Sequence, residues 1–220
     1  MDPSDASFFD PEREITQFDR RLPHWDQAGT FAFVTCRLID SLPADCIERI
    51  KRQRTDLLKS TNLNPSADLQ AEIARLPRRE ASILRWKLFT AWDDELEKCH
   101  GACYLRCSAA SKIVADGLLK FNGDRYVVAA FVVMPNHVHL LAAFAKRGAI
   151  TTQGAAWRQY WAREINSLVG RTGHLWQEDQ FDHLIRSPAA FERTRQYIID
   201  NPRKARLPGG EYRLFVSSDW

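Results

Sequence analysis

The order of apolar and polar positions predicts several strands in this chain. Aromatic and β-branched residues at 30–38 predict a first strand. Two more apolar runs, at 125–134 and 137–144, are separated only by the turn-forming residues Pro135 and Asn136. These two runs therefore predict a β-hairpin whose second strand begins at residue 137.

Apolar residues at helical spacing fill most of the rest of the chain. The stretch 44–100 has this spacing apart from a break around Pro65, and it predicts a helical hairpin inserted after the first strand. Ser187 and Pro188 suit the start of the last helix. That helix should end near Asn201, because the residue before a proline disfavours helical backbone. The other expected elements are helices at 108–119 and 150–169 and a short strand or extended loop within 175–185.

Three or more strands with helices between them predict an α+β fold, in which helices pack on a mainly antiparallel sheet. We expect an extended, acidic N-terminal arm at 1–28. The main domain should cover 29–207, with the helical insertion at about 44–100. The remainder, 208–220, should be a C-terminal tail with a turn at its start.

Charge is spread unevenly along a chain whose net charge is only +3. Residues 1–20 hold six acids against two arginines, a net of −4, whereas residues 146–206 hold eleven Lys and Arg against six acids, a net of +5. A basic C-terminal half suits a polyanion such as nucleic acid. A solvated surface of mixed charge accounts for the same numbers.

Two further features exclude whole classes of protein. The chain has no run of 18 apolar residues and no apolar signal segment, so we expect a cytoplasmic protein with no membrane partner. Its five cysteines do not form an obvious disulfide framework. Cys99, Cys103 and Cys107 are four residues apart but have no second pair of metal ligands, so we interpret them as buried or incidental thiols.

His137 and His139 are the most informative residues of the sequence. Side chains alternate between the two faces of a strand, so both imidazoles should point to one face and Val138 to the other. Two neutral nitrogen donors side by side can bind a divalent metal ion. The alternative is a pair of structural histidines near a sheet edge.

The last predicted helix offers a nucleophile and a third ligand. Tyr197 and Asn201 share one face of it, and Tyr197 should lie at the border of the stripe marked by Phe191 and Ile198, facing the sheet. Packing is the alternative role for Tyr197, and a helix cap for Asn201. Tyr160, beside Trp157 and Trp161, is the second candidate nucleophile or part of a base-stacking platform.

Two segments resemble the signature motifs of the REP-associated tyrosine transposases, which are relatives of the single-tyrosine HUH transposases. They read MPNHVH at 134–139 and QYIIDNPRK at 196–204. The resemblance covers residues 22–40 and 101–207 but not the longer helical stretch. Three shorter segments match the same pattern: LPHW at 22–25, LWQ at 175–177 and DHLIR at 182–186.

This resemblance implies a ferredoxin-like HUH fold and a specific chemistry. His137 and His139 would bind Mg²⁺ or Mn²⁺, with Asn201 as the third ligand. Tyr197 would attack a DNA phosphodiester, remain joined to the 5′ phosphate and release a 3′ hydroxyl. The partner would be single-stranded DNA with a folded hairpin, in a bacterial, nucleoid-associated protein that is a monomer or homodimer. The candidate DNA-binding cations are Arg158, Arg186, Arg193, Arg203 and Lys204.

Two other functions fit parts of the same sequence. A non-catalytic relative with the same fold would bind nucleic acid in a salt-sensitive way without needing a metal ion. A metal-dependent hydrolase of small phosphate esters would use water as its nucleophile and would not need Tyr197.

Overall fold

The computed structural model describes residues 1–19 and 23–220, and its contacts divide the chain into two compact units. Unit 1 comprises Met1–Ile39 and Ala102–Trp220, and unit 2 comprises Asp40–Gly101. Within the described ranges, no helix combines the length and the apolar character that a membrane span requires.

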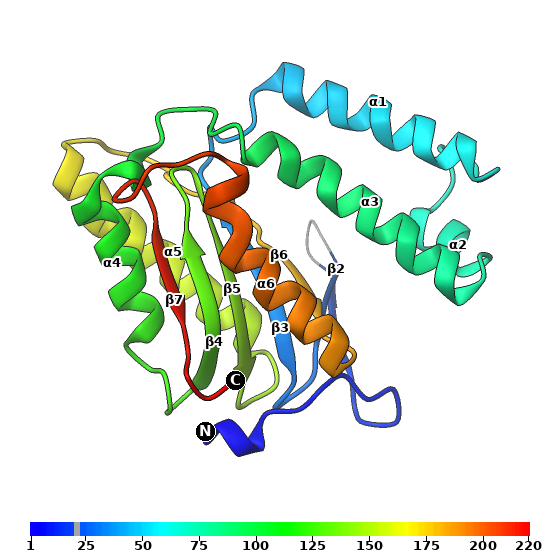
Figure 1. Ribbon diagram of the computed structural model, residues 1–220, viewed down its shortest axis with the longest axis horizontal. Helices are drawn as coiled ribbons and strands as arrows, with labels where there is room; N and C mark the ends of the chain where they lie inside the picture. Colours follow the sequence, from blue (N-terminus) through cyan, green and yellow to red (C-terminus); the bar gives the residue numbers. More distant parts are fainter. Residues whose placement is uncertain (20–22) are drawn as a thin grey trace. The chain divides into compact units, whose positions relative to one another are not determined.

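Unit 1 is built on a five-stranded sheet with the order β6-β3-β5-β4-β7 (Figure 1). Every neighbouring pair of strands runs antiparallel. The α+β class and the antiparallel sheet predicted from the sequence are therefore confirmed. The strands are β3 (Phe31–Arg37), β4 (Tyr126–Val133), β5 (His137–Phe144), β6 (Phe181–Leu184) and β7 (Arg213–Val216).

Helices cover both faces of this sheet (Figure 1). On one face, Val34 and Val138 pack in a continuous core with Trp157 and Trp161. On the other, Phe191 packs against Phe31 with ring centroids 4.8 Å apart. The first face is covered by α4 (Ser108–Leu119) and α5 (Ala149–Val169), which the short 3-10 helix η2 (Tyr104–Arg106) precedes, and the second by α6 (Pro188–Lys204).

Helix α6 begins as the sequence predicts but ends later. Ser187 caps it by accepting a hydrogen bond from the backbone of Ala190 at 3.2 Å. The helix continues through Pro202 to Lys204, so the prediction that it ends near Asn201 is wrong. A residue after the proline stabilises the last turn, because the Leu207 N–H donates to the Pro202 carbonyl at 2.9 Å. Asn201 therefore lies inside the helix and is not its cap.

Both ends of the chain contain structure that the sequence did not reveal. The predicted extended arm holds a short 3-10 helix, η1 (Pro3–Asp5), and an antiparallel pair, β1 (Thr16–Asp19) and β2 (Pro23–Asp26). The LPHW motif begins at residue 22, which lies outside the described residues. The predicted tail supplies the edge strand β7, whose Phe215 stacks on Phe131 at 5.3 Å. Short strands with little alternation escape detection in this way.

The three main elements of unit 2 are helices, as the spacing of its apolar residues predicts. They are α1 (Ala44–Ser60), α2 (Leu69–Ala74) and α3 (Arg78–Leu96). The short helix α2 lies in the break between the two long helices and is capped by Asp68, which accepts from the Ala71 N–H at 2.7 Å. One small core joins the three helices and contains Leu58, Leu63, Ile73, Ala81 and Leu84.

Candidate active site

The turn before β5 fixes the position of the histidine pair. The Met134 N–H donates to the His137 carbonyl at 2.8 Å and closes the two-residue turn. Both central residues of the turn are also held from elsewhere in unit 1. The Pro135 carbonyl accepts from the Leu105 N–H at 3.1 Å, and the Asn136 carbonyl accepts from the Leu38 N–H at 2.9 Å. The start of β5 is therefore anchored on both sides.

The two imidazoles lie side by side on the face of the sheet that α6 covers. Their ring centroids are 4.6 Å apart, and a ring nitrogen of His137 lies within 4.8 Å of one of His139. Both side chains are fully buried. Val138, between them in sequence, belongs to the core on the opposite face. The alternation predicted from the sequence is confirmed.

Each imidazole is oriented through its Nδ1 atom. The His137 Nδ1 lies 2.8 Å from the amide oxygen of Asn136, so Nδ1 donates and the lone pair is on Nε2. The His139 Nδ1 lies 2.8 Å from the hydroxyl of Thr35. The Nε2 of His137 makes no well-formed hydrogen bond within 1–19 and 23–220. Outer contacts of this kind orient histidines that bind a metal ion through the other nitrogen.

The pKa of His137 favours the neutral form that a metal ligand requires. Burial lowers this pKa well below its ordinary value, and the nearby His139 lowers it further. Hydrogen bonding with the side-chain amide of Asn201 acts in the opposite direction and raises this pKa. At neutral pH His137 is therefore uncharged and can donate its Nε2 lone pair.

Tyr197 faces the sheet from α6, as its place on the helix predicts. Its side chain is buried, and its ring centroid lies 5.5 Å from that of His139. Phe33 stacks on His139 at 5.1 Å and also meets Tyr197 edge-on at 6.0 Å, so the three rings contact one another. The Lys204 ammonium lies 4.3 Å from the centre of the Tyr197 ring. A positive charge so close stabilises negative charge that develops on the phenol.

Asn201 lies one turn after Tyr197 and points inward. It is fully buried, and neither polar atom of its amide has a full hydrogen bond to any described residue. Buried polar groups are rarely left without partners, so such an amide indicates a binding site. The two ring nitrogens and one amide oxygen form a donor set that fits a divalent ion such as Mn²⁺. The residues present therefore fit the metal that the sequence predicts.

The predicted DNA-binding cations do not all come together. Arg193, Arg203 and Lys204 are exposed on α6, and Arg203 also pairs with Asp200 at 3.2 Å. Arg186, just before the helix, is also exposed.

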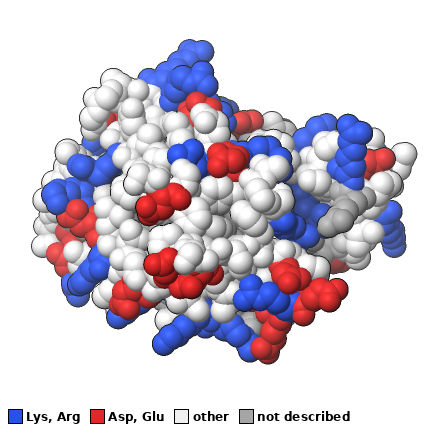
Figure 2. All heavy atoms as spheres, turned by 60° about the horizontal axis from the view of Figure 1, so that its bottom comes forward, with Lys and Arg blue, Asp and Glu red and all other residues white. Residues whose placement is uncertain are grey.

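Arg158 lies elsewhere. It is buried beside Cys36 on the opposite face, and it donates to Gln180 at 2.6 Å. The structure therefore does not bring Arg158 to the histidine pair. Figure 2 shows a face of the molecule on which Lys and Arg side chains are interspersed with Asp and Glu.

Tyr160, the second candidate nucleophile, is also not on the histidine face. It lies on α5, which covers the opposite face of the sheet, and the Arg163 guanidinium is 5.6 Å from its ring. The structure therefore favours Tyr197 over Tyr160 as the tyrosine that accompanies the pair.

The sequence interpretation missed two residues that hold the histidine pair, Thr35 and Asn136, and assigned no site role to a neighbour on the same face, His183. Thr35 lies directly opposite His139 in the ladder, which only the register of the strands reveals. Asn136 has the expected place in the turn, but its bond to the following histidine could not be predicted from that place. His183 lies opposite Phe33 on the same face, with its ring 5.4 Å from the Phe33 ring.

The chain has little detectable similarity to known proteins. No family model and no curated protein matches it. Among solved structures, it is similar to a REP-associated tyrosine transposase bound to a REP hairpin, at 15% identity and a TM-score of 0.40. That alignment covers 81% of this chain and 69% of the transposase chain. Similarity at this level does not establish a common family, and membership remains a prediction from the sequence motifs.

Proposed function

We propose that this chain is a metal-dependent DNA endonuclease and strand transferase of the HUH type, with Tyr197 as its nucleophile. The observation that carries the proposal is the position of the Tyr197 ring, 5.5 Å from the ring of His139 on the same face as His137. The nucleophile and the ligands come from one chain, which supports a site that a single chain completes.

The metal ligands in this proposal are the Nε2 atoms of His137 and His139 and the amide oxygen of Asn201. A bound Mg²⁺ or Mn²⁺ ion would polarise the scissile phosphate and stabilise charge on the departing oxygen. Thr35 and Asn136 contact the two imidazoles at Nδ1, at 2.8 Å each, so the other ring nitrogen, Nε2, is the atom that would bind the metal.

Tyr197 carries out the covalent step. Its phenol oxygen forms a bond to phosphorus as the bond from phosphorus to the 3′ oxygen breaks. The phenol proton passes to solvent, and the departing 3′ oxygen takes up a proton and becomes a hydroxyl. A phenol is a weak nucleophile, and the ammonium of Lys204 over its ring helps to stabilise the phenolate. Attack of a 3′ hydroxyl on the phosphotyrosine reverses the step and rejoins the strand.

The substrate in this proposal is single-stranded DNA that carries a hairpin. The helix that carries Tyr197 also exposes the cations Arg193, Arg203 and Lys204. These side chains can contact the phosphate backbone of such a substrate beside the site. Because Arg158 is buried on the opposite face, we assign it no DNA contact.

The test is a covalent adduct between the protein and DNA. The chain is incubated with Mn²⁺ and a labelled hairpin oligonucleotide and analysed on a denaturing gel. Wild-type protein and Tyr160→Phe should give an adduct, and Tyr197→Phe should give none. An adduct of equal yield in Tyr197→Phe would contradict the assignment of the nucleophile. Salt-sensitive binding without any adduct would instead favour a non-catalytic nucleic-acid-binding protein.

A further inference from the structure

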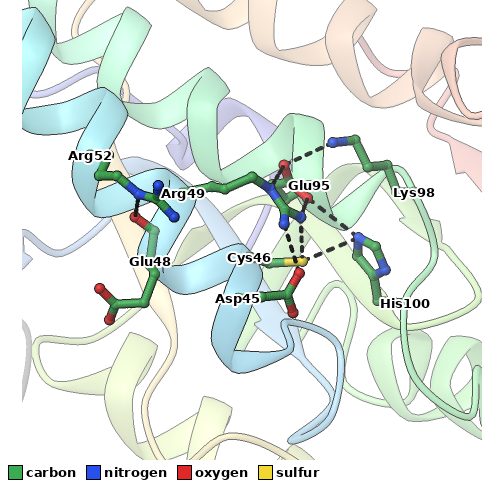
Figure 3. Close-up of polar contacts among 8 residues, drawn as sticks. All are labelled: Asp45, Cys46, Glu48, Arg49, Arg52, Glu95, Lys98 and His100. Atoms are coloured by element: carbon green, nitrogen blue, oxygen red, sulfur yellow. Dashed lines mark hydrogen bonds and ion pairs between the residues drawn. The ribbon is translucent and has the colours of Figure 1, made fainter.

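Unit 2 contains a cluster of three metal-ligating side chains of its own (Figure 3). Cys46 lies in the first turn of α1, Glu95 in the last turn of α3, and His100 in the segment that follows α3. One ligand atom from each lies within 4.8 Å of the other two. The cysteine and the histidine are 54 residues apart, so no sequence spacing indicates the cluster.

The distances within the cluster match those around a tetrahedral metal ion. Bonds from zinc of about 2.3 Å to sulfur and about 2.0 Å to nitrogen and oxygen imply separations of roughly 3.5 Å between sulfur and nitrogen. The same bonds imply roughly 3.3 Å between nitrogen and oxygen. The observed separations are 3.4 Å from Cys46 Sγ to His100 Nε2, and 3.3 Å from that nitrogen to Glu95 Oε2.

The arrangement does not fit a catalytic relay. In a nucleophile, histidine and acid relay, the two partners contact different ring nitrogens. Here the same atom, His100 Nε2, faces both the thiol and the carboxylate. Three donor atoms this close to one another can share a single metal ion.

Two cations balance the charge of the cluster. The Arg49 guanidinium lies 2.9 Å from Cys46 Sγ and 3.2 Å from Glu95 Oε2, and the Lys98 ammonium lies 2.8 Å from Glu95 Oε1 (Figure 3). The Glu95 side chain is only 5% exposed, whereas those of Arg49 and Lys98 are 41% and 54% exposed. Both cations can therefore move into solvent, and Asp45, 2.6 Å from Arg49, can retain the guanidinium.

We propose that Cys46, Glu95 and His100 form a binding site for a borderline-soft divalent ion of the zinc class. A thiolate, an imidazole and a carboxylate are the ligand types that such ions take. On binding, the Cys46 thiol releases its proton to solvent, the Arg49 guanidinium moves away, and water completes the coordination. The ion enters past the partly exposed side chains of Arg49 and His100. It ties the first turn of α1 to the last turn of α3.

Co²⁺ is the probe for this site, because Co²⁺ bonded to a thiolate gives a near-ultraviolet charge-transfer absorption. Titration of the full chain with Co²⁺ should produce this absorption and saturate by about two equivalents, because the unit 1 ligands can also bind Co²⁺, and Cys46→Ser should abolish it. Cys99→Ser is the matched control and should retain it, since the Cys99 thiol is directed to the Glu97 carbonyl at 3.5 Å. The ligands proposed for unit 1 include no sulfur, so this signal is independent of the proposed function.

His100→Ala gives a second test with a partly exposed residue, in case Cys46→Ser fails to fold. Loss of this ligand should weaken Co²⁺ binding at least about tenfold, since even outer contacts contribute that much. Arg49→Gln should tighten binding, because it removes the cation that the metal displaces. No charge-transfer absorption in the wild type, or absorption unchanged in Cys46→Ser or His100→Ala, would overturn the proposal.

Discussion

Asn201 gives the sharpest prediction, because its amide is costly to bury in the metal-free protein. The residue is fully buried, and neither amide atom makes a well-formed hydrogen bond to a described residue, although the amide lies close enough to His137 to raise the pKa of that ring. Burial of an amide without hydrogen bonds costs about 1–3 kcal/mol. Leucine has a similar size, carries no polar atom and suits a helix slightly better. In the absence of metal, Asn201→Leu should therefore be more stable than the wild type by about 1–3 kcal/mol.

Thermal unfolding followed by circular dichroism in EDTA measures this difference. A change of 1 kcal/mol moves the Tm of a chain of this size by roughly 2–4 °C, so the variant should melt roughly 2–12 °C higher. Adding Mn²⁺ should remove or reverse most of this difference. A ligand at 100 times its Kd stabilises the native state by about 2.7 kcal/mol, and only the wild type should gain this.

Asn166→Leu is the matched control for the same change of residue type. The Asn166 amide donates to the Gly173 carbonyl at 2.8 Å and accepts from Arg171 at 3.0 Å. Loss of these bonds should lower stability by about 1 kcal/mol or more. If Asn201→Leu also lowered stability in EDTA, the Asn201 amide would have partners and the reasoning would be refuted.

Three other variants test the surroundings of the site and the core. Thr35→Val removes the hydroxyl 2.8 Å from His139 Nδ1 and should weaken Mn²⁺ binding about 10–100-fold in calorimetry. Gly117→Ala would place a Cβ 2.6 Å from Trp161 Nε1. Such overpacking costs about 1–3 kcal/mol, whereas alanine favours a helix over glycine by about 1 kcal/mol. The variant should therefore unfold at a lower urea concentration than the wild type. Burial raises the pKa of Asp26 in the folded state. The free energy of unfolding of the wild type therefore falls as pH rises from the ordinary pKa of an aspartate through this raised value. The stability of Asp26→Asn relative to wild type should therefore increase between pH 4 and 7 in urea titrations, and a constant difference would contradict the raised pKa.

The sequence alone predicted the features that follow from a regular repeat of apolar positions along a strand or helix. The strand alternation around Val138 correctly placed both histidines on one face, and the helical spacing around Ile198 correctly turned Tyr197 toward the sheet. Helix α4 was predicted with its observed bounds, Ser108–Leu119. Each of these predictions depends only on neighbours within one element.

Features that depend on tertiary contacts could not be predicted in this way. Pro202 was expected to end its helix, but hydrogen bonds from the residues after it extend the helix by a turn. The edge strand β7 becomes a strand only because β4 is available to pair with it. Thr35 lies at the site because the strand register pairs it with His139. Arg158 lies away from the site because the helix that carries it covers the other face of the sheet.

The most direct test of the central claim identifies the residue that becomes joined to DNA. After reaction with Mn²⁺ and a hairpin oligonucleotide, nuclease treatment and trypsin digestion leave a nucleotide on the attacked peptide, which mass spectrometry can sequence. Trypsin cleaves after Arg195 and Arg203, so Tyr197 is the only tyrosine in peptide 196–203. We predict a 5′-phosphotyrosyl nucleotide on this peptide. The same modification on the peptide that contains Tyr160, or cleavage of DNA without any modified peptide, would contradict the claim.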